Sequence, residues 1–229
     1  MPLAPVKPCP DAPVSRALCA AAGGLYLVII LCGVWSEGVA RAGLVTPGVP
    51  EATARAIAAA PGLWSLSIAA DLTMLLADVA IAAVFLRLFA ASSPLLAPLA
   101  FALRLVQAAL IGAALLPLTL APSLAPEAQT YALSLHSLGY DLGLVFFAVN
   151  CAVMAAMLRR AGLAGRLLPL ALAASGAVYM TGSLTALFAP PLNAVMQPAY
   201  ALPLLAESAF CLWLLLRALR RPRATPQTA

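Results

Sequence analysis

Residues 64–88 read WSLSIAADLTMLLADVAIAAVFLRL, and this run decides the fold class of the chain. An α-helix needs about 20 apolar residues to cross the ~30 Å hydrocarbon core of a membrane, and the run exceeds that length. Two carboxylates, Asp71 and Asp78, interrupt it. Ionisable side chains cost roughly 2.5–3.5 kcal/mol each in such a segment, so they normally face a bundle interior or a water-filled cavity. The run therefore predicts a membrane-spanning helix with one polar face.

Five more apolar runs of similar length accompany it. Of the 229 residues, 64% are hydrophobic and only 9% are charged, whereas soluble domains carry about 25% charged residues. The chain therefore predicts one all-α membrane domain over residues 16–219, flanked by a disordered arm (1–15) and a basic tail (220–229). The six predicted spans cover residues 17–35, 64–88, 99–120, 131–158, 167–188 and 200–219.

The distribution of basic residues predicts the orientation of these spans. Ten Lys and Arg residues fall on the side of the termini, against two, Arg41 and Arg55, on the other side. By the positive-inside rule, both termini face the cytoplasm, and we expect the protein in the inner (cytoplasmic) membrane. The net charge of +5 then reflects topology, so no nucleic-acid partner is expected. The ten are Lys7, Arg16, Arg87, Arg159, Arg160, Arg166, Arg217, Arg220, Arg221 and Arg223.

The longest predicted outer loop covers residues 36–63 and includes both outer arginines. Within it, residues 51–60 (EATARAIAAA) have a helix-forming composition between Pro50 and Pro61. This segment predicts a short helix that rests on the outer surface. A lid over an outer cavity is the alternative.

An intramembrane ion pair is expected between Asp78 and Arg104. Asp71 and Asp78 are seven residues apart and so share one face of a helix with Ser67. With the centre of the inner hairpin near residue 92, Asp78 lies fourteen residues away and Arg104 twelve. The two should therefore have similar depths, and a structural ion pair is the simplest way to neutralise both.

A second polar layer is expected nearer the outer face. Asp71, His136 and Glu207 lie on three spans that run in the same direction, at depths of about 7–11 Å below their outer ends. Tyr140 shares the helical face of His136. These four residues predict an outward-facing pocket whose only cation is a protonated His136. Asp141 points away from that face and belongs to neither layer.

Small residues in the fourth span predict close helix packing. Gly139 and Gly143 form a G-x-x-x-G motif, which lets two helix backbones approach each other in lipid. Intramolecular packing is favoured over dimerisation, and the oligomeric state stays open.

Motifs for other kinds of chemistry are missing from the sequence. A single histidine excludes a bis-His haem, an H-E-x-x-H zincin and a three-His metal site. The five cysteines have no C-x-x-C spacing, and no serine lies in a G-x-S-x-G context. No phosphate-binding or dinucleotide-binding glycine pattern occurs. We therefore expect no metal and no cofactor, and no catalytic residue is assigned.

Several short segments, in order, carry a resemblance to a known family. They are Arg16 with Gly24-Leu-Tyr26, Asp71 and Asp78, Arg104-Leu-Val with Gly112, His136-Ser-Leu-Gly-Tyr140, Gly143-Leu-Val-Phe-Phe147, Gly176-Ala-Val-Tyr179, and Glu207 before Leu212-Trp-Leu-Leu215. The chain resembles the bacterial polytopic membrane proteins catalogued as domain of unknown function 4386. Two departures concern packing: Ala148 stands where glycine is expected, and no glycine follows Leu216. The resemblance implies a six-helix integral membrane protein and no particular reaction.

Three functions fit these patterns. The first is binding or transport of a small molecule or ion through the polar pocket in the bilayer, which predicts a cavity reaching Asp71 or Glu207. The second is a non-catalytic membrane scaffold or partner subunit, which predicts that every buried polar group is paired. The third is a membrane-embedded enzyme that uses His136 as a base, which predicts a nucleophile or water within its reach.

Overall fold

The computed structural model describes residues 16–219. The predicted arm (1–15) and tail (220–229) lie outside the described residues. The described part is helical and contains no strand, so the predicted all-α class is confirmed. Six helical stretches are long and apolar enough to cross a membrane, one for each predicted span. These stretches are Arg16–Arg41, Pro61–Phe89, Leu96–Ser123, Pro126–Ala161, Leu167–Phe188 and Pro190–Leu219.

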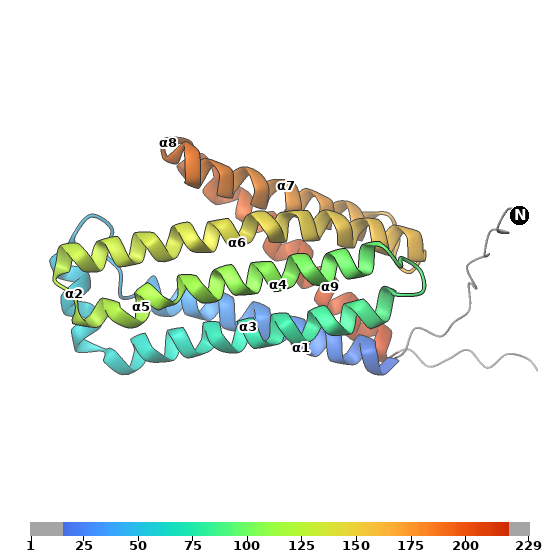
Figure 1. The fold of residues 1–229 in the computed structure, drawn as a ribbon, viewed down its shortest axis with the longest axis horizontal. Coiled ribbons are helices and arrows are strands. Elements are labelled where there is room, and N and C mark those ends of the chain that lie inside the picture. The colour runs from blue at the N-terminus through green and yellow to red at the C-terminus, as the bar shows by residue number, and fades with distance from the viewer. Residues whose placement is uncertain (1–15, 220–229) are drawn as a thin grey trace, which may run out of the picture.

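The main helices of these stretches lie lengthwise along one bundle (Figure 1). Their contacts form a closed ring in chain order. Each packs against the next one along the chain, and the last packs back on the first. The connections from Phe89 to Leu96 and from Ala161 to Leu167 are short, which favours antiparallel packing of the spans that they join. The helices, in the order of the ring, are α1 (Arg16–Trp35), α3 (Pro61–Phe89), α4 (Leu96–Ala114), α6 (Pro126–Ala161), α7 (Leu167–Phe188) and α9 (Ala201–Leu219).

Proline and glycine set several helix ends. Pro61 and Pro126 begin α3 and α6, where the missing N–H of proline costs nothing. At the other end of α6, Gly162 takes φ +61°. That left-handed conformation ends the helix and is favourable for glycine. The local sequence therefore fixes the length of α6, the longest helix of the described chain.

The third span is divided into three pieces near its C-terminal end. Pro117 lacks an N–H, and the α4 helix ends before it at Ala114. The chain continues through α5 (Leu116–Leu120) and the 3₁₀ segment η2 (Ala121–Ser123). The N–H of Leu118 bonds to the carbonyl of Leu115 and not to that of Ala114. The break thus frees a backbone acceptor inside the bundle.

The first span is longer than predicted. After Trp35 the chain continues in a π-helical segment, η1 (Ser36–Arg41), in which Ser36 and Arg41 are buried. The prediction that residues 36–41 belong to an outer loop is therefore wrong. The polarity of Ser36, Glu37 and Arg41 marks the limit of the apolar run, but these side chains point into the bundle, where they find partners.

The predicted helix in the remaining loop is present as α2 (Pro50–Ala59). It packs against α6, α3 and η2, and buries Thr53 and Ile57. Figure 1 shows it at the end of the bundle opposite the end where α1 begins. The helix covers the ends of neighbouring spans.

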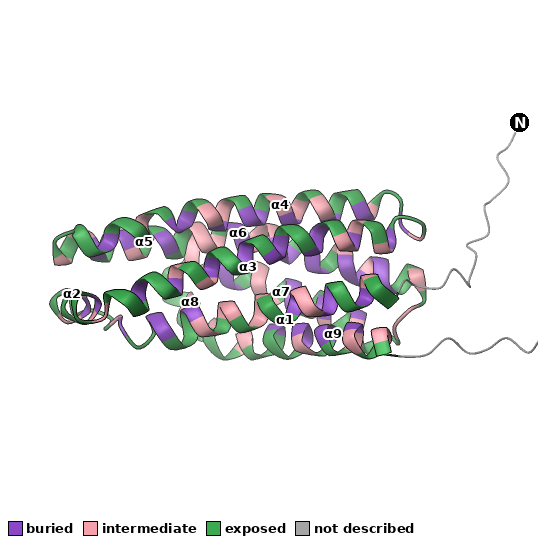
Figure 2. Cartoon of the chain, turned by 90° about the horizontal axis from the view of Figure 1, so that it is seen from below, coloured by how far each residue is buried: buried purple, intermediate pink, exposed green. Residues whose placement is uncertain are grey.

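Apolar side chains cover the outside of the ring. Figure 2 shows buried residues along the faces where helices meet and exposed residues along the outward faces. Leu76, Leu205 and Leu31 are 72%, 70% and 60% exposed. An apolar exterior over the whole length of a bundle is the surface expected of a protein surrounded by lipid.

The glycines of α6 and α7 are sites of close helix contact. A Cβ on Gly139 would lie 2.7 Å from the Cβ of Ala114, and one on Gly143 would lie 2.6 Å from Ile111. On α7, a Cβ on Gly176 would lie 2.6 Å from the carbonyl oxygen of Ala148. The G-x-x-x-G motif therefore packs α6 against α4 within one chain.

Candidate functional site

Asp78 and Arg104 form a buried ion pair between α3 and α4. The Nη2 and Nε atoms of Arg104 lie 2.6 Å and 2.8 Å from Oδ1 of Asp78. The amide of Gln107 donates to Oδ2 of the same carboxylate at 3.3 Å. The guanidinium also stacks over the ring of Phe147, 5.2 Å from its centroid. The structure thus places the expected pair in contact, with its charges compensated.

A cavity of about 380 Å³ opens between the spans. Each of the six spans contributes to its wall. Apolar side chains such as Ile29, Met74 and Leu204 provide part of the lining. The polar and charged lining residues are Glu37, Asp78, Arg104, Gln107, Tyr140, Tyr179, Tyr200 and Glu207.

Glu207, on α9, faces this cavity from a buried position. The hydroxyl of Tyr179 donates to its Oε1 at 2.5 Å, and that of Tyr26 donates to its Oε2 at 3.1 Å. Within residues 16–219, no Lys, Arg or His lies within ion-pair distance of this carboxylate. Two phenol hydroxyls therefore solvate Glu207 without neutralising it.

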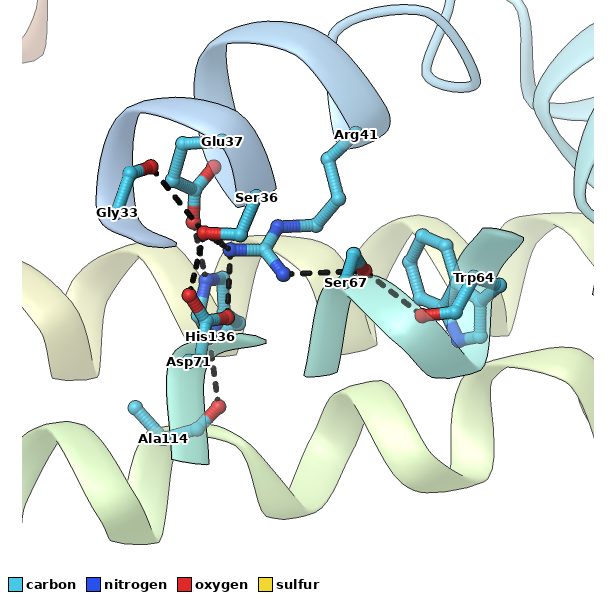
Figure 3. A network of polar contacts seen from close by, with 9 residues as sticks. All are labelled: Gly33, Ser36, Glu37, Arg41, Trp64, Ser67, Asp71, Ala114 and His136. Carbon is cyan, nitrogen blue, oxygen red and sulfur yellow. Dashed lines mark hydrogen bonds and ion pairs between the residues drawn. The ribbon is translucent and has the colours of Figure 1, made fainter. Parts of the chain in front are cut away.

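A second polar network joins η1, α3 and α6 (Figure 3). We call it the outer network, after the outer layer expected from the sequence. Arg41 of η1 is 4% exposed and lies 2.7 Å from Oδ2 of Asp71. The hydroxyl of Ser36 donates to Oδ1 of Asp71 at 2.5 Å. A further bond joins Nη1 of Arg41 to the hydroxyl of Ser67 at 3.3 Å. The π-helical segment thus places a cation over the carboxylate of α3.

Glu37 connects this network to the cavity. Its Oε1 lies 2.5 Å from Nη2 of Arg41 and 3.0 Å from Nε2 of His136. The side chain is 45% exposed and belongs to the cavity wall. Glu37 is therefore the member of the outer network that a molecule in the cavity could contact.

The two contacts of His136 restrict its protonation. Nδ1 lies 2.9 Å from the carbonyl oxygen of Ala114, which can only accept. Nδ1 must therefore carry a proton in that bond, and Nε2 faces the carboxylate of Glu37. A hydrogen bond there needs one more proton, on either Nε2 or Glu37. The break after α4 provides the carbonyl that fixes this arrangement (Figure 3).

The predicted pocket is divided between the cavity and the outer network. Tyr140 and Glu207 line the cavity, whereas Asp71 and His136 do not. Asp78 and Arg104, expected in a separate structural layer, line the same cavity. The expectation that a protonated His136 is the only outer cation is wrong, because Arg41 pairs with Asp71.

Asp141 belongs to a third contact. It accepts a hydrogen bond from the hydroxyl of Ser183 at 3.2 Å, between α6 and α7. It is absent from the cavity wall.

Several site residues are not predicted from the sequence, among them Gln107 and the tyrosines at positions 26, 179 and 200. Glu37 and Arg41 are two more, and for these the sequence holds a signal. They stand four residues apart, the spacing at which an acid and a base meet on one helical face. That spacing indicates that the helix continues past Trp35, although the apolar run ends at this residue.

The geometry does not favour catalysis by His136. Both of its ring nitrogens are engaged, by Ala114 and Glu37, and its neighbours in the described chain include no hydroxyl bonded to it. No group of three or more His, Cys, Asp or Glu side chains that could hold a metal ion is found within residues 16–219.

Comparison with known proteins gives the family. The chain matches the domain of unknown function DUF4386 over residues 21–218. The protein belongs to this family. Its predicted membership is confirmed, and so is the expectation of a multi-pass membrane protein. Searches of curated proteins and of solved structures found no match.

Proposed function

We propose that this protein binds a small polar organic molecule inside the membrane, in the cavity enclosed by its six spans. The observation that supports the proposal best is the cavity itself, of about 380 Å³. Ligand pockets range from roughly 300 to 1,000 Å³ and combine an apolar lining with a few polar groups. Both a carrier and a membrane receptor would bind their ligand in such a cavity.

Unused hydrogen-bonding groups in the wall favour binding over a purely structural core. The Oε1 atom of Gln107 is buried and has no hydrogen-bond partner within the described chain. Tyr140 makes a ring contact with His136, but its hydroxyl bonds to no other described residue. A ligand in the cavity could form hydrogen bonds with both the Gln107 oxygen and the Tyr140 hydroxyl.

The cavity is proposed to open toward the outside of the cell, with both termini in the cytoplasm of a bacterium. Two wall residues, Glu37 in η1 and Tyr200 in η3 (Gln197–Tyr200), belong to segments at the outer ends of spans. Figure 1 shows α7 and α8 (Pro190–Met196) rising away from α6 toward that end. The excess of basic residues at the opposite end supports the orientation. A reporter protein that is active only in the periplasm can be fused to either terminus. Both fusions should be inactive, because both termini are proposed to lie in the cytoplasm.

Filling the cavity tests the proposal. Leu204 lines the cavity, while the adjacent Leu205 does not and is 70% exposed. A panel of small cations, anions and neutral molecules is added to purified wild-type protein, Leu204→Trp and Leu205→Trp, and thermal unfolding is measured. At least one compound should raise the unfolding temperature of wild type and Leu205→Trp but not of Leu204→Trp. The proposal fails if no compound separates the two variants.

A further inference from the structure

We infer that the molecule bound in the cavity is a small organic cation with N–H donors, an ammonium whose charge meets the carboxylate of Glu207. The inference rests on the proposed binding function and adds the class of ligand. It depends on three features of the cavity wall: a carboxylate without an ion-pair partner, an unpartnered acceptor and aromatic rings.

The carboxylates of the core differ in how they are neutralised. Asp78 has Arg104, and Asp71 has Arg41. Glu37 contacts both Arg41 and His136. Glu207 is 7% exposed and has only the hydroxyls of Tyr26 and Tyr179. A buried charge without a counter-charge is costly, so a cation placed in the cavity gains most from this residue.

Arg104 does not form an ion pair with Glu207. Two of its nitrogens lie on Asp78, and its contacts within ion-pair distance in the described chain are to that carboxylate. The pair is neutral as a unit. With Glu207 ionised, the wall therefore has a net negative charge, which attracts a cation and repels an anion.

The remaining groups of the wall also suit an ammonium. Gln107 presents its unpartnered Oε1, an acceptor for an N–H donor. The rings of Tyr140, Phe147, Tyr179 and Tyr200 line the same cavity. Aromatic faces attract organic cations through the negative face of the ring. An organic cation fits this wall better than a metal ion, because a hard metal ion needs about six oxygen ligands.

Three probes of nearly equal size separate the possible ligand classes. They are 2-phenylethylammonium, 2-phenylethanol and 3-phenylpropanoate, which carry a positive, a neutral and a negative head. Binding to the full-length protein in lipid nanodiscs is measured by calorimetry. We expect 2-phenylethylammonium to bind with one site per chain and at least about tenfold more tightly than either of the others, a difference of about 1.4 kcal/mol.

Two variants test the role of the carboxylate. Glu207→Gln keeps the size of the side chain and removes its charge, so it should lose the preference for the ammonium. Glu51→Gln is the matched control, because Glu51 is exposed on α2 and lies outside the cavity wall. It should bind like wild type.

Chemical protection of the wild-type protein gives an answer even if Glu207→Gln does not fold. Dicyclohexylcarbodiimide modifies carboxyl groups in apolar surroundings, and the modified residue is identified by mass spectrometry. The ammonium should protect Glu207 from modification, and the alcohol should not.

The outcomes separate this inference from the proposed function. Equal binding of the ammonium and the alcohol, ammonium binding retained by Glu207→Gln, or no protection of Glu207 would overturn the inference and leave the cavity as a binding site. A lack of binding by all three probes also overturns it. The proposed function fails only if no member of the wider panel distinguishes Leu204→Trp from Leu205→Trp.

Discussion

Two aspartates on one face of α3 are each neutralised by an arginine from a different neighbour. Asp78 pairs with Arg104 of α4, and Asp71 pairs with Arg41 of η1. Because the two aspartates are seven residues apart, they lie two helical turns from each other on the side of α3 that faces the bundle. Each pair ties α3 to another span at a fixed depth.

Removing one member of the inner pair should be more harmful than removing both. Arg104→Ala leaves Asp78 buried without a cation, and we expect a loss of about 3–5 kcal/mol in the free energy of unfolding. The double variant Asp78→Ala/Arg104→Ala should recover part of this loss. Unfolding in detergent gives the measurement, with Arg87→Ala, at an exposed position, as the control. A double variant no more stable than Arg104→Ala would contradict the pairing.

The two arginines that the sequence placed in the outer loop should behave differently. Arg41 is 4% exposed and contacts two carboxylates, whereas Arg55 is exposed and bonds only to the carbonyl of Glu51 in its own helix. Arg41→Ala should therefore destabilise the protein by about 3–5 kcal/mol, and Arg55→Ala by no more than about 0.5 kcal/mol. Equal effects on the unfolding transition would show that Arg41 is not buried in the network.

Depth along a helix predicts some of these contacts and not others. The short inner hairpin sets Asp78 and Arg104 at equal depth, so their pairing can be derived from residue counting. Arg41 could not be placed this way, because its position depends on a π-helical continuation of α1 after the apolar run has ended. Equal depth below the ends of their spans predicts that Glu207 lies beside Asp71. Counting gives depth but not the direction in which a side chain points around the ring, and Glu207 faces Tyr26 and Tyr179 instead.

The contact between α4 and α6 depends on small residues and on the break at Pro117. Gly139 meets Ala114, and one turn before it His136 bonds to the carbonyl of that alanine. The six spans and the glycine motif could be predicted from periodicity and composition. The role of the break could not be predicted. The freed carbonyl of Ala114 is bonded by His136 of another helix, and the sequence does not show which helices are neighbours at that point.

Gly139→Ala should separate α4 from α6. The new Cβ would lie 2.7 Å from the Cβ of Ala114, which cannot move by rotation. We expect a loss of about 1–3 kcal/mol in the free energy of unfolding. Gly24→Ala is the control, since no atom lies within 4 Å of the Cβ it would introduce. If both variants unfold at the same temperature, the close approach of α4 and α6 is not as described.

At the scale of the whole molecule, six spans enclose a cavity that joins the two polar layers. Glu37 brings the outer network to its wall, and Asp78 with Arg104 forms part of the same wall. Helical depth alone predicts two separate layers, an inner structural one and an outer functional one. The ring closes between α9 and α1, and this closure brings Glu207 to the cavity that Asp78 and Arg104 also line. A contact between the first and last spans has no local signal in the sequence.

Access of water to this cavity tests the central claim most directly. Leu204→Cys and Leu205→Cys are each introduced into a variant without native cysteines, in native membranes, and the rate of modification by N-ethylmaleimide is measured. The thiolate is the reactive form of cysteine and requires a polar environment. The cavity predicts rapid modification at position 204, which lines it. Position 205 is absent from the cavity wall and 70% exposed, so lipid should cover it and its modification should be slow. Equal rates at the two positions, or no reaction at position 204, would contradict a cavity open to small polar molecules.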